Sequence, residues 1–189
     1  MRLWTIQPPD VYDLIIKDGY FICDDTKSSM LQRTRFRFAY DWLVDQMTKR
    51  IGNAPENVTY PVWAYLRKPN LDKQFNTENP GTRVCIEFEI DEKDILVTNL
   101  NWWSITALNF APYIKAKTAE EFDEKYDRFE ALPVEQQTAE MLKSWEMLII
   151  PVSYSGPDEP QATFWKLNAD QIINVTFFEQ KGEWIFDEE

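Results

Sequence analysis

Alternation of apolar and polar residues predicts a series of β-strands along this chain. The clearest covers residues 83–90, where Val84, Ile86, Phe88 and Ile90 alternate with charged residues and one cysteine. Shorter strands are expected at residues 2–7, 20–23, 62–67, 95–97 and 161–167, and a final hairpin should turn near residues 181–182. Together these segments predict a mixed or antiparallel sheet of about five to seven strands.

Other segments have helical periodicity. A helix is expected after Pro8 and Pro9 and should end at Gly19, because proline suits the first helical turn and glycine the stop. Residues 31–51 repeat charged side chains on one side and carry a buried stripe on the other, formed by Ala39, Leu43, Met47 and Ile51. Further helices are expected from residue 102, capped by Asn101, over residues 118–130, and after residue 133. The order of elements predicts one α+β domain over residues 1–189, with about four to five helices packed on the sheet.

The stretch Tyr60–Pro69 carries the most distinctive candidate chemistry. If it is extended, Trp63, Tyr65 and Arg67 point to the same side. Two rings and a guanidinium can stack a planar ligand and hold its phosphate or carboxylate. The alternative is that both rings pack in the core and Arg67 pairs with one of many acids.

The formal net charge of −12 argues against long polyanions and anionic membranes as partners, because phosphate contacts depend on lysine and arginine. The charge is uneven, since residues 27–50 hold six basic and two acidic side chains. This segment could suit a small anion, although a solvated helix face is the simpler explanation.

Histidine is absent, which excludes Ser-His-Asp and Cys-His nucleophilic sites and all His-ligated metal centres. No glycine-rich phosphate-binding motif is present. Cys23 and Cys85 are too few for a disulfide framework, so we expect reduced thiols in a cytoplasmic protein without a membrane span. Glu87 and Glu89 share a strand face and could divide acid and base roles, but solvent-facing strands commonly carry such pairs. No metal is expected, because the acidic turn Asp91–Asp94 lacks the glycine-containing loop of a calcium site.

Several stretches resemble a bacterial family of unknown function, the one numbered 3841. They are "MRLWTIQPPDVYDLI", "FAYDWLVDQMTKRIG", "YPVWAY", "KPNL", "VCIEFEI", "KSWEMLI" and "QATFWKL…VTFF". The resemblance runs in order across nearly the whole chain and implies a small bacterial protein. It implies no activity, because none is established for the family.

The opening strand, helix and glycine turn also look faintly like the start of ADP-ribosyltransferase-like folds. That resemblance implies an NAD-holding residue on the first strand, where Trp4 stands in place of the usual histidine. It also implies a late-strand glutamate, where this chain has Gln161. A divergent enzyme of this type is therefore one alternative, as an analogy of fold only.

We predict a ligand site formed by seven residues: Trp4, Thr5, Trp63, Tyr65, Arg67, Gln161 and Trp165. The rings would stack on a small aromatic, anionic ligand, and an NAD-like nucleotide is one candidate cofactor. The second alternative is a non-enzymatic module that binds a protein partner through exposed rings.

Overall fold

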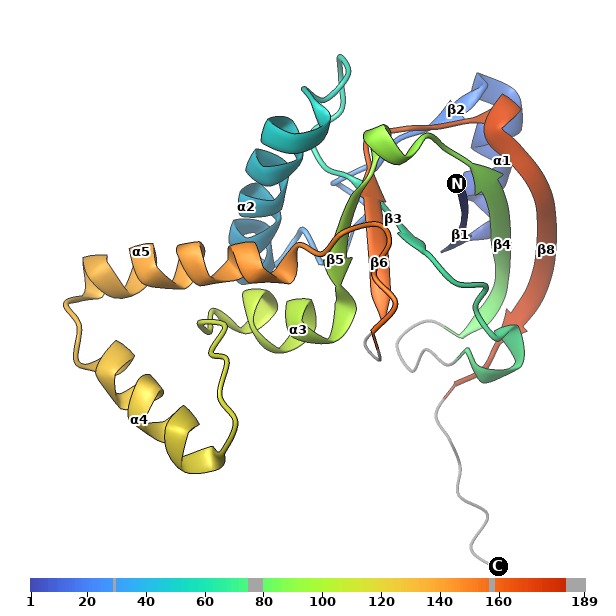
Figure 1. The fold of residues 1–189 in the computed structure, drawn as a ribbon. Helices are drawn as coiled ribbons and strands as arrows, with labels where there is room; N and C mark the ends of the chain where they lie inside the picture. Colours follow the sequence, from blue (N-terminus) through green and yellow to red (C-terminus); the bar gives the residue numbers. More distant parts are fainter. Residues whose placement is uncertain (29, 75–79, 157–158, 183–189) are drawn as a thin grey trace, which may run out of the picture. The chain divides into compact units, whose positions relative to one another are not determined.

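The computed structural model describes residues 1–28, 30–74, 80–156 and 159–182. These residues form a six-stranded sheet with strand order β5-β6-β3-β1-β4-β8, a two-stranded sheet of β2 and β7, and five α-helices (Figure 1). The strand β1 pairs antiparallel with β3 and β4, and β4 pairs antiparallel with β8. The α+β class and the antiparallel sheet predicted from the sequence are confirmed.

The chain forms two compact units, each made of separate segments. The first consists of residues 1–23, 54–95 and 162–189, and the second of residues 24–53 and 96–161. The expectation of one domain over residues 1–189 stays a prediction.

The first unit holds the ring-bearing strands and one α-helix. Its elements are β1 (Arg2–Gln7), α1 (Pro9–Asp18), β2 (Tyr20–Phe21), β3 (Val62–Tyr65), β4 (Gly81–Glu89), β7 (Leu167–Asn168) and β8 (Ile172–Gln180). Strand β6 (Pro160–Phe164) is shared by the two units, with residues 160–161 in the second and residues 162–164 in the first.

Helix α1 forms where the prolines and the glycine predicted it. Pro9 begins the helix, and Gly19 caps its end in the left-handed conformation, with φ of 80°. The Gly19 N–H donates to the Ile15 carbonyl at 2.9 Å, which satisfies a carbonyl that the helix end would leave without a partner.

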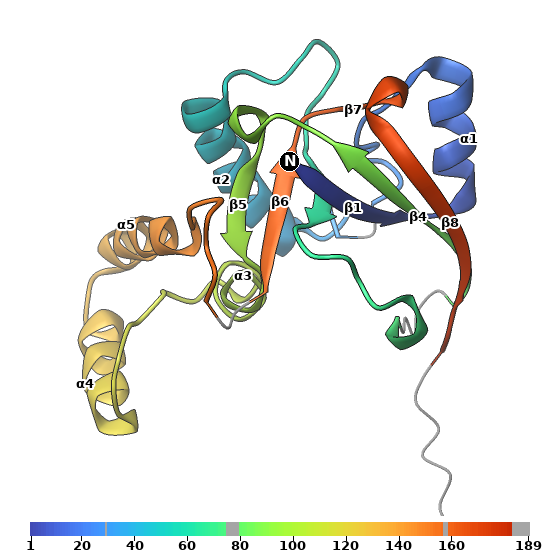
Figure 2. The same cartoon turned by 45° about the vertical axis from the view of Figure 1, so that its right-hand side comes forward.

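One face of the first unit's sheet is an apolar core. Leu3, Val84, Ile86 and Phe88 are fully buried, and Leu3 lies opposite Phe88 in the β1–β4 register. Helix α1 lies beside β4 and β8 (Figure 2) and covers this same face, because its Tyr12 ring contacts Phe177, the register partner of Val84. Burial of these apolar side chains contributes to the stability of the unit.

The second unit is mainly helical. Its elements are α2 (Thr34–Ile51), β5 (Leu96–Asn99), α3 (Leu100–Ile105), α4 (Ala119–Glu130) and α5 (Val134–Ser144). Its core surrounds the fully buried Trp145, whose ring meets Phe38 and Trp42 edge to face at centroid distances of 6.1 and 5.6 Å. The Trp145 Nε1 donates to the Ala111 carbonyl at 2.8 Å, so this buried indole is satisfied.

Several predicted boundaries need correction. Helix α2 begins at Thr34 and not at residue 31, because the preceding residues form a hydrogen-bonded loop and Arg33 is extended. Helix α3 is capped by Asn99, whose Oδ1 accepts from the Trp102 N–H at 3.1 Å, and not by Asn101. The predicted strand 161–167 is divided into β6 and β7 by a bend at Trp165.

The predicted final hairpin is only partly described. Strand β8 forms and pairs along its length with β4, with Gly81 opposite Gln180. The expected return strand lies at residues 183–186, outside the described residues.

Candidate functional site

Three rings lie on one face of the first unit's sheet. Trp4 on β1 is the register partner of Tyr65 on β3, and register partners present their side chains on the same face. Trp63 precedes Tyr65 by two residues and therefore shares this face. We call Trp4, Trp63 and Tyr65 the aromatic face. All three side chains are half-buried.

Strand alternation explains why the rings lie away from the core of this unit. On β1, Leu3 and Thr5 are buried on the core face. The alternating residues Trp4 and Ile6 point to the opposite face. On β3 the burial pattern is the same, with Val62 and Ala64 buried and the two rings half-buried. The sequence pattern therefore set which side of each strand the rings occupy.

The indole nitrogen of Trp4 has an unusual environment. Trp4 Nε1 is shielded from solvent and has no hydrogen-bond acceptor among the residues that the structure describes. A buried donor left without an acceptor costs about 1–3 kcal/mol. An acceptor atom supplied from outside the chain would remove this cost.

Charged groups lie on the same face. Glu87 on β4 is the other register partner of Trp4, and its side chain is only 13 % exposed. Its carboxylate lies 3.2 Å from the Arg2 guanidinium, which also reaches Glu89 at 3.5 Å. The predicted pair Glu87 and Glu89 therefore shares one arginine, and the half-buried carboxylate of Glu87 is neutralised by an ion pair.

Cys85 occupies the same strand face, two residues before Glu87. Burial raises the pKa of its thiol to about 11, although the positive charge of nearby Lys68 lowers it. The negative charge of Glu87 raises the same pKa further. A thiol with such a pKa is almost entirely protonated at neutral pH and is a poor nucleophile.

The remaining predicted site residues lie in different places. Arg67 follows the end of β3 and is exposed. Thr5 is buried on the core face of β1, and its Oγ1 accepts from Gln7 Nε2 at 2.8 Å. Trp165 is 7 % exposed and follows β6. The structure brings Trp4, Trp63 and Tyr65 together on one face, while Thr5 points to the other.

Gln161 belongs to the second unit. It is buried at 8 % exposure, and its Nε2 has no hydrogen-bond partner in the described parts of the chain.

Sequence reasoning missed Arg2 as a partner of Glu87. The available signal was Arg2's position two residues before Trp4, which places both side chains on one strand face.

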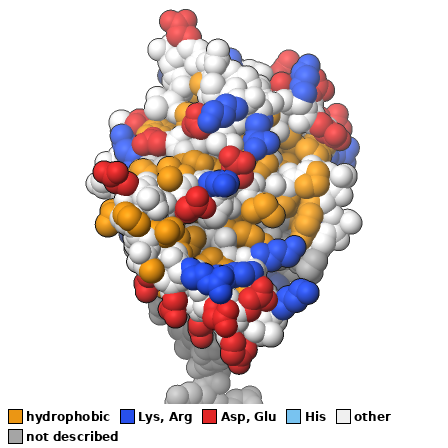
Figure 3. All heavy atoms as spheres, turned by 60° about the vertical axis from the view of Figure 1, so that its left-hand side comes forward, with side chains coloured by type: hydrophobic (Ala, Val, Ile, Leu, Met, Phe, Trp, Pro, Cys, Tyr) orange, Lys and Arg blue, Asp and Glu red, His pale blue; other side chains and the backbone are white. Residues whose placement is uncertain are grey.

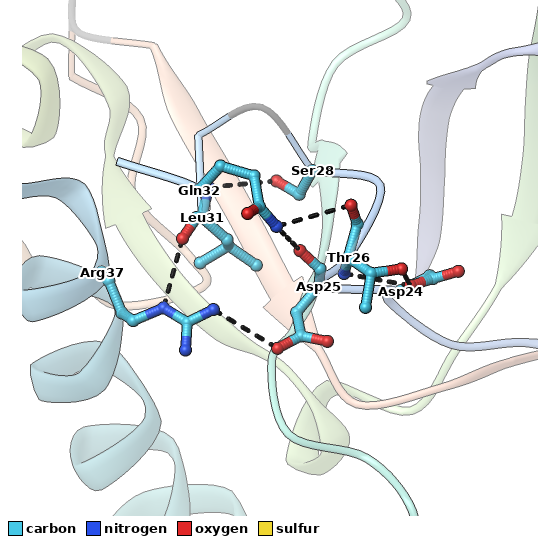
Figure 4. Close-up of polar contacts among 7 residues, drawn as sticks. All are labelled: Asp24, Asp25, Thr26, Ser28, Leu31, Gln32 and Arg37. Carbon is cyan, nitrogen blue, oxygen red and sulfur yellow. Dashed lines mark hydrogen bonds and ion pairs between the residues drawn. The ribbon is translucent and has the colours of Figure 1, made fainter. Parts of the chain in front are cut away.

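The basic segment of residues 27–50 is folded against acids that precede it (Figure 4). Arg37 donates through Nε to the Leu31 carbonyl at 3.2 Å, and its Nη2 lies 3.5 Å from Asp25 Oδ2. Gln32 Nε2 donates to the Asp25 carbonyl at 2.9 Å. Lys27 pairs with Asp24. Two of the segment's six basic side chains thus pair with acids of the preceding loop, which favours a structural role for this part of the segment.

Two further findings concern the described residues only. No helix among them is long and apolar enough to cross a membrane. No group of three or more Cys, Asp or Glu side chains among them is arranged to hold a metal ion.

Comparison with known protein families gives a match over most of the chain. The sequence model of a domain of unknown function, DUF3841, matches residues 2–173 of the 189. No curated protein and no solved structure matches the chain, and the faint similarity to ADP-ribosyltransferase-like folds is not confirmed. Because the match spans nearly the whole sequence, this chain belongs to the DUF3841 family.

Proposed function

We propose that this chain binds a small, planar, anionic ligand against its aromatic face, and that nucleotides are the ligand class that fits best. Three half-buried rings on two adjacent strands offer stacking surface for a base. Stacking of a base on an aromatic side chain contributes about 1–3 kcal/mol, whichever base it is.

The observation that carries this proposal is the indole nitrogen of Trp4. A half-buried ring whose N–H is shielded and lacks an acceptor among the described residues is a directional binding group. Small-molecule sites are mostly apolar and hold a few such polar groups, which fix ligand orientation. A ring nitrogen or carbonyl oxygen of a nucleobase is an acceptor of the required kind.

The anionic part of the ligand follows from the residues after β3. Arg67 and Lys68 are both exposed, and Lys68 lies near enough to Cys85 to affect its pKa. Their charges can therefore meet a phosphate near the face that bears the rings. Thr5 and Trp165 are buried, so this proposal gives them no ligand contact.

Calorimetric titration with AMP, ATP and NAD tests the proposal. We expect a saturable heat with at least one of them, and binding about threefold to tenfold weaker after Trp4→Phe, which keeps a ring and removes the N–H. Trp63→Leu should weaken binding further because it removes stacking surface.

The matched control is Trp102→Phe, since Trp102 is also half-buried but lies in the second unit. It should leave affinity unchanged. Absence of heat with all three compounds at millimolar concentration would contradict a nucleotide ligand. Equal weakening by Trp4→Phe and Trp102→Phe would contradict the placement of the site.

A further inference from the structure

Helix α4 carries an aromatic stripe that the chain leaves accessible. Phe122, Tyr126 and Phe129 recur at a spacing of four and three residues, which places them on one side of the helix. Phe122 is 41 % exposed, the other two rings are half-buried, and none of the helix's twelve residues is buried. The rings contact each other in series, with centroid distances of 5.9 and 6.3 Å.

Local hydrogen bonds and ion pairs, rather than core packing, stabilise this helix. Thr118 caps its start by accepting from the Glu121 N–H at 3.2 Å. Lys125 donates to Glu121 at 2.6 Å and to the Lys115 carbonyl at 2.7 Å. An isolated helix of this length is marginal in water, and helices in proteins normally gain their stability by burying the apolar side. In α4 that side is only partly covered, with Phe122 exposed and the other two rings half-buried.

A hollow adjoins the end of the stripe. It has a volume of about 430 Å³ and lies between the C-terminal part of α4 and the start of α5, lined by Arg128, Phe129, Leu132, Gln136, Ala139 and Glu140. Gln137 fixes the turn between the helices, since its Nε2 donates to the carbonyls of Glu130 and Leu132 at 2.9 and 2.8 Å. The hollow is therefore shaped by an ordered helical hairpin, which is drawn in gold and orange in Figure 1.

Charge determines the chemistry of the partner. Helix α4 has six acidic and two basic residues, a net charge of −4, and α5 adds two acids against one lysine. In the space-filling view of Figure 3, acidic side chains gather along the lower edge, with lysine and arginine side chains directly above them and hydrophobic side chains further up. A nucleic acid would be repelled by such a surface, and a second copy would bring an equal negative charge against it.

We propose that the α4–α5 hairpin docks a basic, amphipathic segment of another protein. Apolar side chains of that segment cover Phe122, Tyr126 and Phe129 and enter the hollow, and its lysines or arginines meet the acids along α4. Helix-in-groove recognition works in this way, with apolar anchors for affinity and charges for selectivity.

The test uses the ¹⁵N-labelled full chain and three synthetic peptides of equal length. One alternates leucine and lysine at helical spacing, one replaces the leucines with serine, and one replaces the lysines with glutamate. We expect only the leucine–lysine peptide to produce saturable amide shifts that map to residues 119–143. Its affinity should fall at least tenfold between 0.05 and 0.5 M salt, because charge contributes to docking.

Two exposed-site variants assign the surface. Phe122→Asp should weaken binding of the leucine–lysine peptide more than tenfold. Ile16→Asp, which places the same change at a 62 % exposed position of α1 in the first unit, should leave it unchanged. Far-UV circular dichroism confirms that both variants keep their helices.

Three results would overturn the proposal. They are shifts that map outside the hairpin, equal binding of the leucine–lysine and serine–lysine peptides, and self-association of the chain that Phe122→Asp abolishes. The last result would identify a second copy as the occupant. None of these outcomes depends on nucleotide binding at the aromatic face.

Discussion

Trp4 on β1 stands directly opposite Tyr65 on β3 and, across its other edge, opposite Glu87 on β4. One indole thus lies between a phenol ring and a half-buried carboxylate whose charge is matched by Arg2. This relationship joins three strands that are far apart in sequence. It also leaves the Trp4 N–H without an acceptor among the described residues, which gives the first prediction.

The same substitution should affect stability very differently at two tryptophans. Trp4→Phe removes a shielded donor that lacks an acceptor, so the free energy of unfolding should change by less than about 1 kcal/mol. Trp145→Phe removes a donor bonded to the Ala111 carbonyl and leaves a gap beside Phe38 and Trp42. It should lower the free energy of unfolding by about 2–4 kcal/mol.

Urea unfolding followed by far-UV circular dichroism measures both changes. Each variant changes one indole to a phenyl ring, so each serves as the control for the other. A loss at Trp4→Phe as large as that at Trp145→Phe would mean that the Trp4 N–H is already satisfied in the free protein.

Cys85 should be unreactive in the folded chain. With a pKa raised to about 11 by burial, only a small fraction of its thiol is ionised at pH 8. A thiol-specific reagent should modify Cys23, which is half-buried, well before Cys85, and Cys23→Ser should leave a slow reaction that accelerates in urea. Rapid labelling of the folded Cys23→Ser variant would disprove the raised pKa.

The same thiol predicts a loss of stability at alkaline pH. The neutral form is favoured in the folded state, so the unfolded chain ionises first, near the ordinary pKa of 9.0. The contribution of Cys85 is present below pH 9 and is lost as the pH rises to about 11. The stability of the wild-type chain should therefore fall more steeply over this range than that of Cys85→Ala. Parallel pH profiles of unfolding free energy would contradict this.

The cap of α4 should control that helix locally. Thr118→Ala removes the acceptor for the Glu121 N–H and should cost about 1 kcal/mol, which speeds amide exchange in residues 119–130 by about fivefold. Global stability should change little, because no residue of α4 is buried. Thr138→Ala in α5 is the control, since its hydroxyl only bonds back to the Val134 carbonyl. Hydrogen exchange that leaves α4 unaffected would contradict the cap.

Acid should weaken α4 before the core unfolds. The hydrogen bond from Lys125, followed by that from the Lys117 N–H, lowers the pKa of Glu121 below its ordinary value of 4.5. The ionised Glu121 therefore stabilises α4 above pH 4.5, and this stabilisation is lost as the pH falls through the lowered pKa of Glu121. Amide chemical shifts in α4 should move toward coil values in that range. Glu121→Gln should remove most of this pH dependence. If the variant instead kept the pH profile of the wild type, the Glu121 side chain would not be the group responsible.

Much of the local structure follows from short sequence signals. The prolines and Gly19 set the limits of α1, Thr118 set the start of α4, and alternation set the two faces of β4. Such signals work because caps and strand faces depend on residues within a few positions of each other. The same alternation placed Trp63 and Tyr65 on one side of β3, away from Val62 and Ala64.

The sequence by itself therefore determined the class of fold, the faces of the strands and the exclusion of histidine chemistry. Only the tertiary structure decided that β1 lies between β3 and β4, that Trp4 meets Tyr65, and that Arg2 pairs with Glu87. It also decided that Trp165 is buried while Phe122 is exposed. Strand order, register and burial depend on contacts between segments distant in sequence, and periodicity contains no information on which distant segment a given face will meet.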